Sequence, residues 1–191
     1  MWQKILRDSS FFLALLLFDR DLAEGYRLVG CPCGGRLHRA AYERKPRGAP
    51  SGLPEGFSIR ESFCCCREGC RRRLTPPSLR FLGRRVYLGV VVVLVSAMVH
   101  GVTEKRAKAM WQMCGVSRRT LSRWRKWWRQ SFVGCELWRL LRGRFVPPVN
   151  DSWLPLSLLE RIQGRKVSEQ VLGTLHLLLP VTAGARCVVA F

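Results

Sequence analysis

The clearest structural pattern in the sequence lies in the second half of the chain, where residues 105–128 read KRAKAMWQMCGVSRRTLSRWRKWW. Gly115 permits a tight turn, because glycine adopts left-handed backbone conformations at no steric cost. Ser117 is suited to cap the helix that follows, since a serine hydroxyl accepts a hydrogen bond from an otherwise free N–H of the first turn. The stretch therefore predicts two helices, 104–113 and 118–132, joined by a tight turn, which is the layout of a helix-turn-helix.

The helix after the turn has one apolar and one basic face. At about 100° per residue its apolar side chains fall on one side, which we expect to face the core: Leu121, Trp124, Trp128 and Phe132. The opposite side carries cations and hydrogen-bonding side chains, which in a recognition helix reach bases and phosphates of the DNA major groove. We expect double-stranded DNA to be contacted by Arg118, Arg119, Ser122, Arg123, Lys126 and Arg129.

Several alternatives remain open for this segment. The helix could simply pack on its neighbours with its charges solvated. Its tryptophans could stack on unpaired bases, although their helical spacing favours core packing: Trp124, Trp127 and Trp128. Trp111 stands four residues before the turn glycine, where the motif normally has a small residue. This departure predicts a wider spacing between the two helices.

The charge of the chain points to a polyanionic partner. The chain has 33 Lys and Arg against 13 Asp and Glu, a formal net charge of +20 and an isoelectric point near 10.9. Nucleic acid and an anionic membrane surface both attract such a charge. Residues 104–144 contain twelve Lys and Arg against Glu104 and Glu136, a local net charge of +10. Because this excess surrounds the two helices described above, we expect the partner to be DNA.

The cysteines fall in two tight groups, as metal ligands do. Six of the nine lie between residues 31 and 70, in the stretches CPCGG (31–35) and FCCCREGC (63–70). Tetrahedral Zn²⁺ takes four soft ligands at about 2.3 Å, and glycines beside the cysteines allow the turns that point sulfur at the metal. We expect a structural Zn²⁺ bound by Cys31, Cys33, Cys66 and Cys70.

Two substitutions in this ligand set remain open. Cys65 could replace Cys66. In the first pair, Cys31 and Cys33, one residue separates the cysteines where a zinc ribbon usually has two, so His38 could take the place of one of them. Four thiolates close the coordination shell, whereas a catalytic zinc needs an open position. We therefore expect the metal to stabilise the fold and the arginines at 67 and 71–73 to touch phosphate.

The cysteines and the apolar runs indicate a cytoplasmic protein. Clustered metal ligands, rather than disulfides, are typical of a reducing compartment. The run at 11–18 leads straight into charged residues with no small-residue cleavage site, which does not fit a secretory signal. The run at 86–99 is shorter than the ~20 residues that span a bilayer. A membrane protein built on these two runs is the alternative, but we expect no membrane partner.

Two pairs of prolines, Pro76-Pro77 and Pro147-Pro148, divide the chain, because consecutive prolines continue neither a helix nor a central strand. We expect a mostly α fold, in which a small zinc-ribbon-like module is followed by a three-helix helix-turn-helix domain and a helical tail. The expected segments are an N-terminal helical segment ending near Gly25 (1–27), the zinc-ribbon-like module (28–77), the helix-turn-helix domain (78–134) and the C-terminal tail (135–191). Further helices are expected at 80–99, 154–162 and 168–179.

Three stretches resemble small zinc-binding, helix-turn-helix proteins of bacterial insertion sequences: GCPCGGRLHRAAYERKPRG (30–48), CCCREGCRRRLTPPSLRFLGRRVY (64–87) and GVSRRTLSRWRKWW (115–128). The resemblance lies in the overall layout and covers roughly residues 10–160. It implies a protein that recognises the ends of a mobile element or assists a transposase. A transposase would then be a further partner.

We expect binding rather than catalysis, with no small-molecule substrate. A transcriptional regulator is an alternative with the same chemistry. A catalytic transposase or nuclease would need carboxylates that converge on divalent metal ions. The candidates for that role, which no strand-rich pattern brings together, are Asp19, Asp21, Asp151, Glu160 and Glu169.

Overall fold

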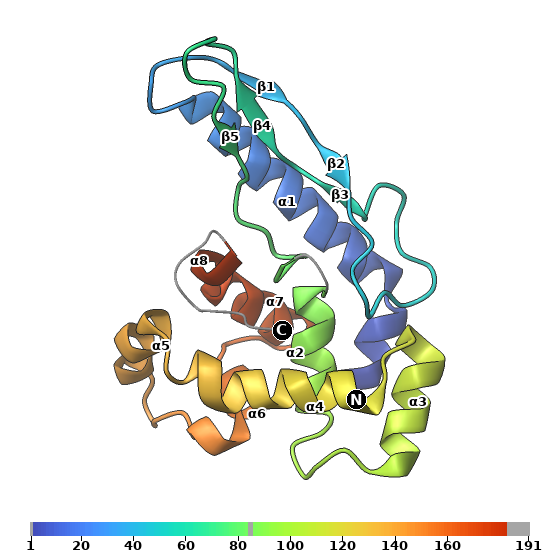
Figure 1. Ribbon diagram of the computed structural model, residues 1–191. Coiled ribbons are helices and arrows are strands. Elements are labelled where there is room, and N and C mark those ends of the chain that lie inside the picture. Colours follow the sequence, from blue (N-terminus) through green and yellow to red (C-terminus); the bar gives the residue numbers. More distant parts are fainter. Residues whose placement is uncertain (1, 84–85, 183–191) are drawn as a thin grey trace.

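The computed structural model describes residues 2–83 and 86–182. The fold is mostly helical, as expected, with two small antiparallel sheets (Figure 1). Residues 183–191 of the expected tail lie outside the described residues. Within the ranges just given, every helix is too short or too polar to cross a bilayer. The elements are η1 (Trp2–Arg7), α1 (Ser9–Val29), β1 (Leu37–Arg39), β2 (Tyr42–Glu43), β3 (Ile59–Arg60), β4 (Phe63–Cys65), β5 (Arg73–Leu74), α2 (Leu88–Ser96), α3 (Glu104–Cys114), α4 (Arg118–Lys126), η2 (Trp127–Phe132), α5 (Glu136–Leu141), η3 (Arg142–Arg144), η4 (Asp151–Trp153), α6 (Leu156–Leu159), α7 (Val167–Leu177) and α8 (Leu179–Thr182).

Helix α1 begins at a cap that the sequence provides. The Asp8 carboxylate accepts a hydrogen bond from the backbone N–H of Phe11 at 3.1 Å, and this satisfies a free donor of the first turn. The helix ends at Gly30, whose φ of 80° favours glycine. It therefore runs through Gly25, where we expected it to end. A glycine weakens a helix but does not stop it while the backbone stays helical.

Helix α2 is the centre of the core. All of its residues, from Leu88 to Ser96, are buried, and it packs against η1, α4 and α7. A helix that is apolar on every side is stable only when neighbours cover every side. It is shorter than the expected helix at 80–99, because the backbone before it is held outside the helix, for example by the N–H of Leu88 donating to the carbonyl of Arg80 at 2.8 Å.

The two helices around Gly115 form as predicted. Gly115 has a φ of 62°, in the left-handed region, and the Ser117 hydroxyl accepts a hydrogen bond from the N–H of Thr120 at 3.3 Å. Helix α4 continues into the π-helical turn η2. The expected core face is buried, and so is Trp127, so these tryptophans pack in the core and are not free to stack on bases.

The cysteine-rich segment forms a small sheet beside the C-terminal end of α1. Its strand order is β1-β4-β5, with Leu37 opposite Cys65 and Phe63 opposite Leu74. Strands β2 and β3 form a second antiparallel pair. The apolar cluster under the sheet is small and consists of Ala23, Cys31, Leu37, Phe63 and Cys65. So small a core gives little stability by itself.

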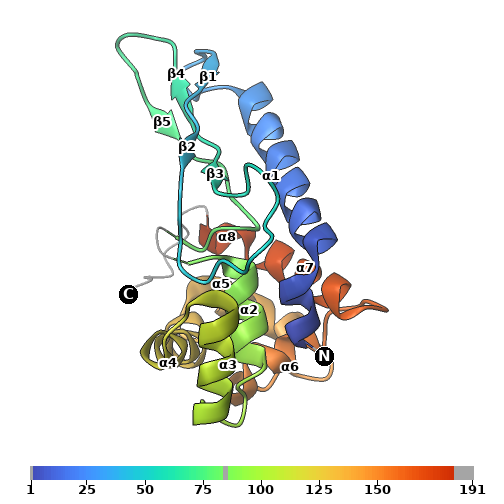
Figure 2. The ribbon, with the colours of Figure 1, turned by 90° about the vertical axis from the view of Figure 1, so that its right-hand side faces the viewer.

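One larger hydrophobic core joins the remaining elements. It takes residues from η1, α1, α2, α4, η2 and α7, together with Phe57 from the loop before β3. All four segments that we delimited from the sequence therefore contribute to it. The molecule is elongated, with the cysteine-rich sheet at one end of α1 and most of the other helices gathered at the other end (Figures 1 and 2).

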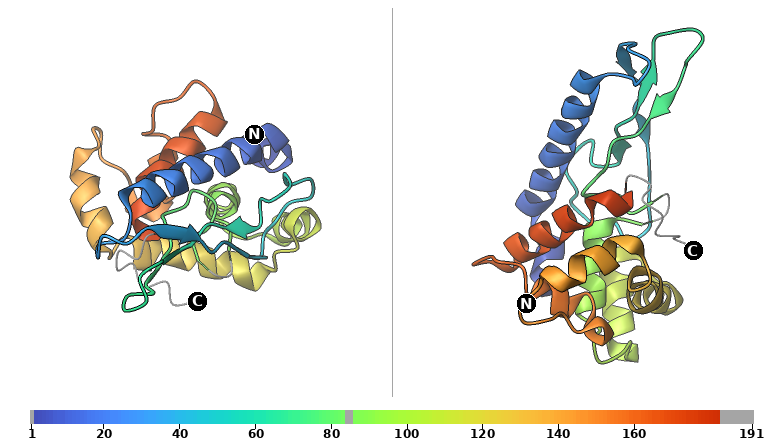
Figure 3. Two further views of the ribbon diagram at one scale, coloured as in Figure 1. Left: turned by 90° about the horizontal axis from the view of Figure 1, so that it is seen from above. Right: turned by 90° about the vertical axis from the view of Figure 1, so that its left-hand side faces the viewer.

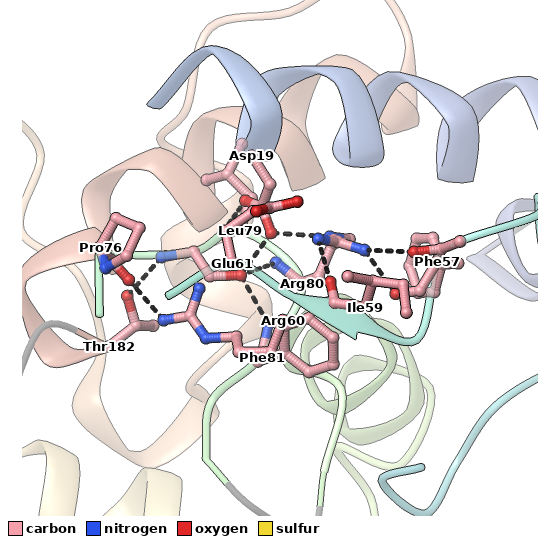
Figure 4. A network of polar contacts seen from close by, with 12 residues as sticks. Asp19, Phe57, Ile59, Arg60, Glu61, Pro76, Leu79, Arg80, Phe81 and Thr182 are labelled. Carbon is pink, nitrogen blue, oxygen red and sulfur yellow. Dashed lines mark hydrogen bonds and ion pairs between the residues drawn. The ribbon is translucent and has the colours of Figure 1, made fainter. Parts of the chain in front are cut away.

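A buried polar network ties these two ends together (Figure 4). The Asp19 carboxylate of α1 accepts a hydrogen bond from the Arg80 guanidinium at 2.7 Å. Arg80 also donates to the carbonyls of Phe57 and Ile59 and contacts the rings of Phe57 and Phe81. The network therefore fastens the linker before α2 to α1, to the loop before β3 and to β3 itself.

Candidate metal centre and nucleic-acid interface

Four cysteine side chains meet at the C-terminal end of α1. The sulfur atoms of Cys31, Cys33, Cys65 and Cys70 all lie within 4.8 Å of one another. Sγ of Cys31 lies 3.7 Å from Sγ of Cys70, and Sγ of Cys33 lies 3.5 Å from Sγ of Cys65. Four sulfurs at about 2.3 Å from a tetrahedral metal are about 3.8 Å apart, whereas a disulfide needs about 2.05 Å. The spacing therefore fits a tetrahedral metal site.

Two turns and a strand bring the four thiols together. Cys31 and Cys33 lie in the turn after α1, which is closed by a hydrogen bond from the N–H of Gly34 to the carbonyl of Cys31 at 2.7 Å. Cys65 is the last residue of β4, and Cys70 lies in the turn between β4 and β5. Each pair is thus held by a local turn, and the pairing of β1 with β4 brings the two pairs together.

Backbone N–H groups favour the thiolate form of three of the cysteines. Those of Cys33, Gly35 and Arg67 act to lower the pKa of Cys31, Cys33 and Cys65 respectively. The Gly35 N–H, followed by the Cys65 thiol, lowers the pKa of Cys33 to about 6. For Cys65 the Arg67 N–H also favours the thiolate, but burial and the neighbouring thiols outweigh it and raise the pKa to about 12. Crowded thiols do not all ionise without a nearby cation, so a bound metal would complete this site.

Gly35 is required by the packing of the sulfur atoms. A Cβ atom at this position would lie 2.6 Å from Sγ of Cys65 and 3.4 Å from Sγ of Cys33. Any other residue would push the two sulfurs apart. The glycine that we expected only to allow a turn therefore also leaves room for the cluster.

The structure corrects one of the four expected ligands, because Cys65, the alternative left open, takes the place of Cys66. Side chains alternate along a strand, and on β4 Phe63 and Cys65 share the buried face. Cys66 lies beyond the strand with an exposed side chain. His38, the other substitute, is exposed on β1 and is not part of the group. The spacing of Phe63 and Cys65 in the sequence indicates that the two share one face of a strand, but only the pairing of β4 with β1 places that face toward the first pair of cysteines.

Exposed arginines surround the cluster, at Arg36, Arg67, Arg71, Arg72 and Arg73. Arg67 donates to the carbonyl of Cys33 at 2.6 Å and so braces the first turn. Among the described residues, no carboxylate forms an ion pair with any of these five. By contrast, Arg39 on β1 pairs with Glu61 at 2.7 Å. None of these five arginines is therefore held in an ion pair by a described carboxylate, although the exposed carboxylate of Glu68 lies in the turn between β4 and β5.

Helix α4 exposes a second basic surface at the other end of the molecule. Five of the six residues expected to contact DNA are exposed: Arg118, Arg119, Ser122, Arg123 and Lys126. In the part of the chain that the structure describes, no lysine or arginine of α3 or α4 forms an ion pair. The opposite side of α4 is fixed in the core by Leu121 and Trp124. The helix thus presents an uncompensated cationic face from a rigid base.

Arg129 differs from the other expected contact residues. Both Arg129 and Arg125 donate to the backbone carbonyl of Val99, at 3.3 and 3.1 Å. Burial, and then the charge of Arg125, lower the pKa of Arg129. Arg129 therefore tethers η2 to the backbone that follows α2, and we remove it from the expected DNA contacts. The tether involves a carbonyl 30 residues away, which no local pattern could indicate.

Trp111 does not separate the two helices. Its side chain is 59% exposed, whereas the buried residues of α3 are Ala107, Met110 and Cys114. Trp111 therefore points away from the interface between α3 and α4, and its size gives no reason to expect a wider spacing between the two helices.

Three of the five carboxylates considered for a nuclease site have other contacts. Asp19 pairs with Arg80. Asp151 accepts a hydrogen bond from Nε1 of Trp138 at 2.9 Å, and Glu169 accepts one from the N–H of Arg165 at the start of α7 at 2.8 Å. The side chains of the remaining two, Asp21 and Glu160, are exposed. Within the described ranges, the one group of three or more potential metal ligands is the cysteine cluster.

The chain matches no family model, no curated protein and no solved structure. Its function must therefore be argued from the cysteine cluster and the basic face of α4.

Proposed function

We propose that this chain is a zinc-stabilised protein that binds double-stranded DNA through the basic face of α4. The observation that carries the proposal is the set of exposed, unpaired cations on α4, opposite a buried face and directly after a capped turn. Cations on a rigid helix suit the phosphates and base edges of a major groove. The contacts proposed are Arg118, Arg119, Ser122, Arg123 and Lys126.

The proposed metal is a structural Zn²⁺ held by Cys31, Cys33, Cys65 and Cys70, in a module of the zinc-ribbon kind. Support comes from the spacing of the sulfur atoms and from the small apolar core beside them. A module that buries little apolar surface needs a further source of stability. Metal binding supplies it, because the free energy of ligation is coupled to folding. Four thiolates leave no open coordination position, which favours a structural role over a catalytic one.

The cellular setting belongs to the same proposal. Thiolate ligands favour a reducing compartment such as the cytoplasm, and all eight described cysteines are free thiols. The resemblance to insertion-sequence proteins suggests that the chain assists transposition, with a transposase as partner. Transcriptional regulation uses the same DNA-binding chemistry, and a transposase gene beside this one would favour the first role.

A salt series tests the proposal directly. Zinc-loaded full-length protein is titrated into fluorescently labelled duplex DNA, and in parallel into vesicles that contain anionic lipid. We expect the logarithm of DNA affinity to fall linearly with the logarithm of salt, by about 0.9 per phosphate contact. Arg119→Ala with Arg123→Ala should weaken DNA binding, whereas Arg27→Gln, which removes a cation already paired with Glu24, should not. Equal binding of vesicles and DNA, unchanged in the α4 variant, would reject the proposal.

A further inference from the structure

We infer that the chain holds one DNA duplex at two places about one helical turn apart. One place is the basic face of α4, and the other is the turn between β4 and β5 (residues 66–72), called here the knuckle turn. The inference rests on the proposed function and adds the form of the ligand, which is a duplex longer than one turn.

Helix α1 sets the distance between the two basic surfaces. Its 21 residues, at a rise of about 1.5 Å each, span about 31 Å. Cys31 follows the end of α1 closely, and its sulfur lies 3.7 Å from that of Cys70 in the knuckle turn. At the other end, η1 packs on α2, and α2 packs on α4. One turn of B-DNA is about 34 Å long, so the two surfaces are spaced to meet the same side of a duplex.

Both basic surfaces lie on the same side of the molecule. In Figure 2, α4 and the knuckle turn both lie to the left, with α1 to the right. In the view from above, the left panel of Figure 3, α4 and the knuckle turn both lie below α1. The backbones of α4 and of the knuckle turn therefore lie on the same side of α1, so we expect a straight duplex to contact both without meeting α1.

Two contacts hold this spacing fixed. The buried ion pair of Asp19 with Arg80 joins α1 to the linker before α2. The loop after β2 packs on α2 and α4 so closely that a Cβ on Gly48 would lie 3.1 Å from Val90 and 3.2 Å from Trp124. When two binding surfaces are held rigidly, the duplex bound at one surface is present at a high effective concentration near the other, and the second contact strengthens binding.

The knuckle turn suits phosphate contacts rather than base reading. Arg71 and Arg72 are exposed, and no described carboxylate forms an ion pair with either. The segment is a short turn, not a helix that can enter a groove. Phosphate contacts fix register and orientation but carry no sequence information directly. We therefore assign sequence reading to α4 and sequence-independent anchoring to the knuckle turn.

The test compares a duplex of about 24 bp, which spans both places, with one of about 8 bp, which at about 3.4 Å per base pair is only about 27 Å long and reaches one place at a time. Affinities are measured for zinc-loaded wild-type protein, for Arg71→Gln combined with Arg72→Gln, and for Arg27→Gln as the matched control at the same end of the molecule. Zinc content is measured for each variant, because it reports whether the cluster is intact. The longer duplex offers more binding positions to every protein. For each protein we therefore divide the affinity for the long duplex by that for the short one, and comparing this ratio between proteins removes the statistical factor.

We expect the double variant to lose about tenfold in affinity for the long duplex and almost none for the short one. Its salt slope should fall by about two on the long duplex only. A double variant that keeps its zinc and weakens both duplexes equally, or neither, overturns the two-point contact. If the wild-type protein binds neither duplex, the proposed function itself fails, which is a different result.

Discussion

Asp19 and Arg80, 61 residues apart in the sequence, form an ion pair of 2.7 Å with side chains only 2% and 1% exposed. Removing one partner leaves the other charge buried and unpaired, which costs about 3–5 kcal/mol. We therefore expect Asp19→Asn to lower the free energy of unfolding by that amount, measured by urea denaturation of the zinc-loaded protein. Arg27→Gln breaks an exposed pair with Glu24 and should leave the free energy nearly unchanged. Equal stability of the two variants would contradict this role.

Gly35→Ala should weaken metal binding, because the added Cβ would lie 2.6 Å from Sγ of Cys65. An extra methyl group in a packed site typically destabilises it by about 1–3 kcal/mol. The affinity for zinc, measured by competition with a chelator, should therefore fall about tenfold or more. Gly69→Ala is the matched control within the same module, since a Cβ there meets nothing within 4 Å. If both variants bind zinc alike, the sulfur cluster does not have the described geometry.

Serine replacements distinguish the two candidate fourth ligands. We expect one tightly held zinc per chain, lost or much weakened in Cys65→Ser and retained in Cys66→Ser, because only Cys65 lies in the cluster. Metal analysis of the purified variants measures this directly. A chelator should unfold the cysteine-rich module of the wild-type protein, since ligation and folding are coupled. Protein that contains no metal and stays folded in chelator would reject the zinc site.

Arg119 and Arg123 should affect specificity, whereas peripheral cations should not. After selection of a preferred duplex from a random pool, Arg119→Ala or Arg123→Ala should cost about 1–3 kcal/mol on that duplex and relax the preference. Lys105→Ala should weaken preferred and random duplexes equally and lower the salt slope by about one. If the α4 variants leave the preference unchanged while Arg71→Ala abolishes it, the knuckle turn is the reader.

We expect no nuclease or strand-transfer activity from this chain alone, because among the described residues no three carboxylates converge, and Asp19, Asp151 and Glu169 have contacts in different elements. Supercoiled DNA incubated with the protein and magnesium or manganese should stay intact. Metal-dependent nicking that disappears in Asp151→Asn or Glu160→Gln would establish a catalytic site.

Much of the local structure follows from the sequence. The left-handed turn at Gly115, the cap at Ser117 and the buried face of α4 were all predicted, and all three are present. Caps and turns depend on residues within about four positions of one another, so a short stretch contains the information needed. The cysteine clusters likewise predicted a four-thiol site, because the turns that hold each pair are local.

Other features depended on contacts between distant parts of the chain. The choice of Cys65 over Cys66 follows from the register of β4 against β1, because a shift of one residue moves every side chain of a strand to the other face. The tether of Arg129 to Val99 and the burial of Asp19 against Arg80 join residues 30 and 61 positions apart. The local pattern of residues is therefore enough to indicate which segments form turns and caps and which turns hold pairs of cysteines. Tertiary structure decided which side chains are left free to meet a ligand, since burial and ion pairing depend on elements that sequence spacing does not place together.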